Sequence, residues 1–194
     1  EFMDCIQQQD DPYMSMRAYL MANKVHRQEN DLSESRNVLM EGINKLPIRE
    51  QPAIMEELVQ TDIDLAEKTG QSWYQREAID YLDKIIANGW AGYTDYDTLT
   101  VLHQKQGNLK KVEDTLKSMT EIYGNDYNIQ KRYAFMEIRK QEIQPQHLRD
   151  YSAFEKYYKE AVSLYNKELK NNETDQEMLL LDNVYGQLWA GGWL

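Results

Sequence analysis

The 194-residue chain has 41% hydrophobic residues and a mean hydropathy of −0.79, which is typical of a soluble protein with a substantial core. Only 9 Gly and 4 Pro leave few helix breakers, so we expect an all-α fold. The net charge of −11, from 22 basic and 33 acidic residues, argues against a general nucleic-acid-binding surface.

The one cysteine, Cys5, excludes an intrachain disulfide framework and a multi-cysteine zinc site. No apolar run approaches the roughly 20 residues that span a bilayer, and no signal peptide is visible. We therefore expect a cytoplasmic protein without a membrane segment. Glu1 and Phe2, ahead of Met3, are interpreted as a cloning remnant.

The first predicted helix begins at Asp11-Pro12, because an Asp cap followed by Pro suits the first turn of a helix. Asn30-Asp31 breaks the apolar pattern, and residues 47–52 form a predicted loop between prolines. The helices expected around and beyond these breaks cover approximately 32–46, 53–68, 72–88, 127–141 and 151–169, with a hairpin of two short helices over 96–124.

Two further helix starts are predicted from capping residues. Ser72 is expected to cap the helix that follows it. Thr174 to Glu177 reads as a capping box, in which the Thr hydroxyl and the Glu carboxylate each accept from a free backbone N–H. The capping box predicts a last helix, which Gly191-Gly192 ends.

The hairpin from Tyr96 to Gly124, which turns at Gly107-Asn108, is the clearest of several repeats. Its second helix carries apolar residues 34 positions after equivalent ones upstream: Ala78 and Val112, Leu82 and Leu116, Ile85 and Met119. One constant interval also relates the first hairpin to this one, through Tyr19 and Tyr96, His26 and His103, and Leu39 and Leu116. In the first hairpin, the small residues Ser35 and Gly42 around Leu39 are expected to allow close helix packing.

A period of 34 residues with two helices per unit resembles the tetratricopeptide repeat (TPR). Tyr96, Leu99 and His103 stand where that family has Trp, Leu and Tyr, whereas Asn23 and Thr100 replace its usual small residue. The resemblance implies one TPR-like domain over 3–194, an α-α superhelix (solenoid) of about four helix pairs plus a C-terminal capping helix. The pairs lie near 12–47, 52–88, 94–124 and 127–170, and the cap near 174–190.

The C-terminal part also resembles the repeat segment that follows the catalytic domain in bacterial serine/threonine protein kinases. The resemblance rests on the runs YNIQKRYAFMEIRKQ, RDYSAFEKYYKEAVSLYNKEL and DQEMLLLDNVYGQLWAGGWL. It implies a regulatory tail whose kinase domain lies upstream, because no Gly-rich nucleotide loop, HRD-type loop or DFG motif occurs in these residues.

No catalytic or metal-binding constellation is evident, and no cofactor is expected. His26 and His103 occupy equivalent repeat positions and are interpreted as packing residues, and His147 lies in a predicted loop. The carboxylates of Glu56, Glu57, Asp62 and Asp64 read as a solvated helix face.

The TPR resemblance implies a peptide-binding groove along the first helix of each pair. The groove positions are Arg17, Leu20, Lys24, Arg27 and Gln28 in the first repeat, and Asn128, Lys131, Phe135, Ile138 and Arg139 in the fourth. The third repeat gives Thr94, Asp97, Val101, Gln104 and Lys105. Arg and Lys donors at both ends favour an acidic or C-terminal-carboxylate peptide.

We therefore expect a non-catalytic protein–protein interaction module that binds a protein or peptide, with neither nucleic acid nor membrane as partner. The alternative is a structural dimerisation element, a homodimer without a peptide ligand. An enzyme whose site is assembled from scattered residues is a third reading, but no nucleophile and base fall together in the sequence.

Overall fold

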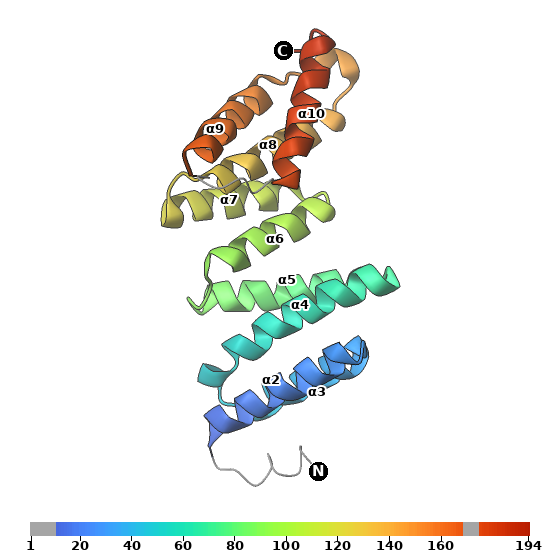
Figure 1. The fold of residues 1–194 in the computed structure, drawn as a ribbon, viewed down its shortest axis with the longest axis vertical. Helices are drawn as coiled ribbons and strands as arrows, with labels where there is room; N and C mark the ends of the chain where they lie inside the picture. Colours follow the sequence, from blue (N-terminus) through green and yellow to red (C-terminus); the bar gives the residue numbers. More distant parts are fainter. Residues whose placement is uncertain (1–10, 169–174) are drawn as a thin grey trace. The chain divides into compact units, whose positions relative to one another are not determined.

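The computed structural model describes residues 11–168 and 175–194, and within these ranges it contains α-helices, two short 3-10 turns and no strands (Figure 1). The prediction of an all-α fold is therefore confirmed. The helices are α2 (Pro12–Gln28), α3 (Leu32–Lys45), α4 (Pro52–Thr69), α5 (Ser72–Ala87), α6 (Tyr93–Lys105), α7 (Leu109–Tyr123), α8 (Tyr127–Glu142), α9 (Ser152–Glu168) and α10 (Gln176–Ala190). The 3-10 turns are η1 (Ile48–Glu50) and η2 (Gln146–Leu148).

The start of α2 follows the predicted cap, whereas two other predicted caps are wrong. Asp11 accepts a 3.0 Å hydrogen bond from the Tyr13 backbone N–H. Ser72 lies inside α5, and Gln71 occupies the cap position without a side-chain hydrogen bond. At α10 the cap is Asp175, which accepts from the backbone N–H groups of Glu177 (2.9 Å) and Met178 (3.2 Å). Thr174 lies outside the described residues.

The first and third hairpins turn in the same way. Asn30 and Gly107 both adopt positive φ angles, 59° and 71°, two residues after the ends of α2 and α6. In each turn the next residue, Asp31 or Asn108, donates its backbone N–H over 2.9 Å to the carbonyl of the equivalent histidine. The side chains of Asp31 and Asn108 then cap α3 and α7. The two hairpins, which one constant interval relates in sequence, therefore also share the same turn geometry.

The chain divides into two compact units at Asp95–Tyr96. In the first unit, α3 packs against α2 and α4, and α4 packs against α5. The predicted close packing is present, because Ser35, Leu39 and Gly42 are all buried. A Cβ atom at Gly42 would lie 3.1 Å from Cγ of Tyr19, so α2 and α3 meet here in near-contact. The remaining fully buried core residues of this unit include Ile54, Leu58, Ala78, Leu82 and Ile85.

The second unit is built on α8, which packs against α7 and α9, and on α10, which contacts both α8 and α9. Phe154 of α9 and Leu181 of α10 are completely buried in one apolar cluster. The tyrosines of this unit pack against each other, as in the stacked pair of Tyr133 and Tyr157, whose ring centroids lie 4.8 Å apart. α10 therefore covers an apolar surface that α8 and α9 leave open.

No helix in the described part of the chain is both long enough and apolar enough to cross a membrane.

Candidate functional site

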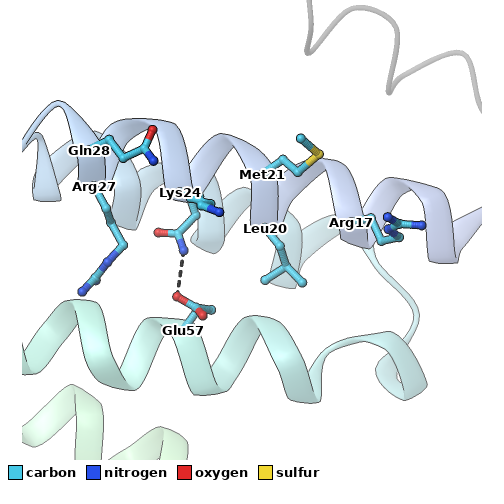
Figure 2. Close-up of a pocket in the computed structure, with 8 residues that line it drawn as sticks. Arg17, Leu20, Met21, Lys24, Arg27, Gln28 and Glu57 are labelled. Atoms are coloured by element: carbon cyan, nitrogen blue, oxygen red, sulfur yellow. Dashed lines mark hydrogen bonds between the residues drawn. The ribbon is translucent and has the colours of Figure 1, made fainter.

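A hollow of about 600 Å³ runs along α2 in the first unit (Figure 2). Seven of its lining residues come from α2 and one from α4: Arg17, Leu20, Met21, Asn23, Lys24, Arg27, Gln28 and Glu57. All five groove positions inferred for the first repeat therefore line one hollow. We call it the α2 hollow.

The helical period explains why these side chains share one side of α2. Residues 17, 20, 24, 27 and 28 recur at three- and four-residue steps, so they project from one face. Tyr19 and Asn23 lie on the adjacent face of α2, and each is buried with only 2% of its surface exposed. Asn23 accepts from the Ser35 hydroxyl of α3 and donates to the Glu57 carboxylate of α4 over 2.8 Å, which fixes the floor of the hollow.

The cations of the α2 hollow are unequally paired. Arg27 forms an ion pair with Asp64 and donates over 3.0 Å to the Thr61 hydroxyl, so it joins α2 to α4. Arg17 and Lys24 are both exposed, and neither has a carboxylate partner within residues 11–168 and 175–194. The hollow thus presents two cations without a carboxylate partner among the described residues, although the Arg17 guanidinium lies 5.9 Å from the Tyr13 ring centroid, on a chain of net charge −11.

A smaller hollow of about 240 Å³ lies in the second unit, between α6, α8 and α10. Phe135 and Arg139, inferred groove residues of the fourth repeat, both line it. Arg139 pairs over 2.6 Å with Glu142, three residues along the same helix. The lining residues are Val101, Gln104, Lys105, Arg132, Phe135, Arg139, Glu177 and Leu180.

The other three groove residues inferred for this repeat, Asn128, Lys131 and Ile138, do not line the hollow, and Lys131 is paired instead. Its side chain is only 5% exposed, and its ammonium group lies 2.7 Å from Asp175 and 2.8 Å from Glu177. The neighbouring Arg132 binds both carboxylate oxygens of Asp97, at 2.8 and 3.0 Å, and reaches Glu177 at 2.6 Å. Lys131 and Arg132 are therefore paired with acids that come from α6 and from the start of α10.

The ionisation of this cluster is set by opposing effects. Burial alone would raise the carboxyl pKa values of Asp175 and Glu177, but hydrogen bonds from Lys131 lower both below their usual range, helped by Arg132 at Glu177. Burial also disfavours the Arg132 charge, yet Asp97 and Glu177 raise the pKa of its guanidinium. Asp175, Glu177 and Arg132 are thus charged at neutral pH.

A second buried ion pair, in the first unit, was not anticipated from the sequence. Asp62, expected on a solvated helix face, is completely buried and accepts a 2.6 Å hydrogen bond from Arg36 Nε. Arg36 also reaches Glu77 at 3.2 Å, so it links α3 to α4 and α5. Burial raises the pKa of Asp62 to about 6, although Arg36 opposes the shift. Its Oδ2 atom accepts no hydrogen bond from any residue that the structure describes. The helical period of α4 could not reveal that Asp62 is buried, because its partner Arg36 lies 26 residues away in sequence.

The histidines do not form a reactive centre in the described part of the chain. His103 is buried at 4% exposure, as expected for a packing residue, while His26 lies 3.6 Å from the Glu29 carboxylate. His147 is exposed in η2. No group of three or more His, Cys, Asp or Glu side chains with metal-binding geometry occurs among the described residues.

The described residues thus form an open hollow along α2 with two exposed cations, and a smaller hollow along α8 in which Arg132 and Arg139 are paired with acids. The sequence matches no known protein-family model and no curated protein.

Proposed function

We propose that this chain is a TPR-like α-solenoid scaffold that binds an acidic peptide or protein segment along α2, without catalysing a reaction. The observation that carries the proposal is the pair of exposed cations, Arg17 and Lys24, in an open hollow of an acidic chain. They lie seven residues apart, which is two helical turns, so both face the same side.

Two features support the TPR-like part of the proposal. The turns at Asn30 and Gly107 are alike, and the positions that depart from the family's small residue have similar roles. Asn23 is hydrogen-bonded to Ser35 in the second helix of its hairpin, and Thr100 lies 3.8 Å from the Met119 sulfur in the second helix of its own. Both hairpins therefore use that position as a buried contact between their helices.

The hollow's chemistry favours a carboxylate ligand over a phosphate-rich or apolar one. Arg17 and Lys24 donate to oxyanions, whereas Leu20 and Met21 provide apolar surface between them. Glu57 at the floor repels a dense anion such as a nucleic-acid backbone but tolerates spaced carboxylates on either side.

The test uses a short fluorescein-labelled peptide of alternating Glu and Leu, with an amidated C-terminus, and measures its binding to the full chain by anisotropy. We expect binding that weakens as salt rises, because the contacts are charge pairs at a solvent-exposed surface. The double variant Arg17→Glu/Lys24→Glu should lose roughly tenfold or more in affinity.

Lys110→Glu is the matched control, since Lys110 is an exposed α7 cation outside the hollow. Arg27 is left intact in both variants because it holds α4 through Asp64. Equal affinity of the double variant and the control would rule out the α2 hollow as an acidic-peptide site. A version of the probe with a free C-terminal carboxylate tests whether a chain end binds better than internal acids.

On the sequence resemblance alone, we further propose that the scaffold is the regulatory tail of a bacterial serine/threonine protein kinase. The coding sequence upstream of Met3 tests this directly, because the catalytic motifs of a kinase domain are unmistakable. An upstream sequence without them would contradict it.

A further inference from the structure

A row of exposed apolar side chains follows α2 beside the hollow. Met14, Met21 and Val25 are 43%, 57% and 50% exposed, and their spacing of seven and four residues places them on one line along the helix. Large apolar residues are ordinarily exposed singly, so three in register along one helix form a stripe that no described residue covers. We call Met14, Met21 and Val25 the α2 stripe.

The α2 stripe and the cations of the hollow are neighbours on the same helix. Met21 belongs to both, and Figure 2 shows it pointing away from α4 while Leu20 and Arg27 point toward α4. Arg17 and Lys24 each follow a stripe position by three residues, so they lie between the stripe and the wall of the hollow. A binding partner that covers the α2 stripe would therefore contact both Arg17 and Lys24 along one edge.

We propose that this face of α2 docks an amphipathic helix from an acidic protein partner, with its apolar side on the α2 stripe and its carboxylates on Arg17 and Lys24. The inference rests on the proposed function and adds the form of the ligand. A helix laid along α2 repeats its own residues every seven positions, which matches the interval from Met14 to Met21 and from Arg17 to Lys24. In an extended peptide the side chains alternate between two faces every two residues. Its apolar and acidic side chains therefore do not recur at the seven-residue helical interval of the α2 stripe and of the two cations.

Charge decides between an acidic partner and a second copy of this chain. The docking face bears two cations that have no carboxylate partner among the described residues, and a two-fold dimer centred on this face would place the same cations opposite one another. Methionine suits the proposed occupant, because its flexible thioether adapts to partner side chains of different shape.

The second unit contains an arrangement of the proposed kind. The acids that begin α10, Asp175 and Glu177, bind Lys131 and Arg132 of α8, and Met178 and Leu181 of the same helix enter the apolar core. An acidic helix start followed by apolar residues thus already docks on a basic helix within this protein.

The experiment measures the binding of three peptides to the full chain by fluorescence anisotropy. All three contain the same numbers of Glu and Leu residues. In the first, Leu recurs at three- and four-residue steps and Glu occupies the flanking positions, which favours an amphipathic helix. The second carries two central Pro residues that block the helix, and the third is the alternating peptide. We expect the helical peptide to bind at least roughly tenfold more tightly than the other two.

The protein variants separate the stripe from the hollow. Met14→Ser/Val25→Ser changes only residues outside the hollow and should weaken the helical peptide roughly tenfold. Ile122→Ser, at an exposed α7 position, should have no effect. This inference would be overturned if the helical and proline peptides bound equally, if Met14→Ser/Val25→Ser had no effect, and if Arg17→Glu/Lys24→Glu still abolished binding. That result would leave the proposed function intact. Failure of every peptide to bind would overturn both. Circular dichroism verifies that each variant stays helical.

Discussion

Lys131 of α8 donates a 2.7 Å hydrogen bond to Asp175, whose carboxylate also caps α10. One buried ammonium group therefore fixes both the position of α10 and the conformation of its first turn. Since Lys131 also pairs with Glu177, the start of this helix is held at two points.

Replacing Lys131 by Met should destabilise the docking of α10 by about 2–4 kcal/mol, because Asp175 then loses its ammonium partner and Glu177 keeps only Arg132. Hydrogen exchange of the α10 backbone amides measures the free energy of its opening. Lys159→Met is the control, since Lys159 pairs with Glu155 on the surface of α9 and its loss should leave the opening of α10 nearly unchanged. Unchanged α10 exchange in Lys131→Met would show that apolar packing alone holds the helix.

Acid should weaken the same contact. The pKa values of Asp175 and Glu177 are lower in the folded chain than their ordinary values, so their contribution is complete above those ordinary values and disappears as the pH falls through the lowered ones. The wild type should therefore lose more stability than Lys131→Met when the pH falls below about 4. Thermal unfolding followed by circular dichroism across this range gives the comparison. Parallel losses would contradict the assignment.

Asp62 should show the opposite pH dependence. Its folded pKa of about 6 lies above the ordinary 3.8, so its ionisation destabilises the fold as the pH rises through that interval. Asp62→Asn has no charge to bury, and its stability relative to wild type should increase by on the order of 2–3 kcal/mol between about pH 4 and pH 7. Urea unfolding at each pH measures the difference, with Asp83→Asn as an exposed control. A constant difference across the range would contradict it.

Sequence could predict what a single helix determines by itself. The TPR resemblance implied that Arg17, Lys24 and Arg27 lie along one groove, and the structure places all three around one hollow. It could not show that Arg27 is already paired, because the partner Asp64 lies 37 residues away on another helix.

The same limit explains Lys131 and Asp62. The TPR resemblance implied that Lys131 lines the groove, but Asp175, one of the acids that enclose it, follows 44 residues later. Asp62 belongs to a run of acids on α4, and only the packing of α3 shows that one of them is buried against Arg36. Pairing between distant helices, rather than local pattern, decided both outcomes.

Two glycines in helices should respond oppositely to a methyl group. Gly42→Ala places Cβ 3.1 Å from the ring of Tyr19, which is 2% exposed and cannot rotate away, so about 1 kcal/mol or more of stability should be lost. Gly186→Ala meets no atom within 4 Å and should gain about 0.5–1 kcal/mol through helix propensity. Urea unfolding of the two variants gives the comparison, and a stabilised Gly42→Ala would show that α2 and α3 can separate at little cost.

Ending the chain after Gln144 should test whether α8 depends on the helices that follow it. The cut removes α9 and α10 and exposes Ala134 and Tyr133, which α9 covers in the intact chain. Because a repeat buries its apolar face only against its neighbours, we expect α8 to lose helicity or the fragment to self-associate. Circular dichroism and light scattering distinguish these outcomes. A longer fragment ending after Glu168 keeps α9 and loses only α10, so it should be affected less. A monomeric fragment 1–144 with its full helical content would contradict a continuous repeat array.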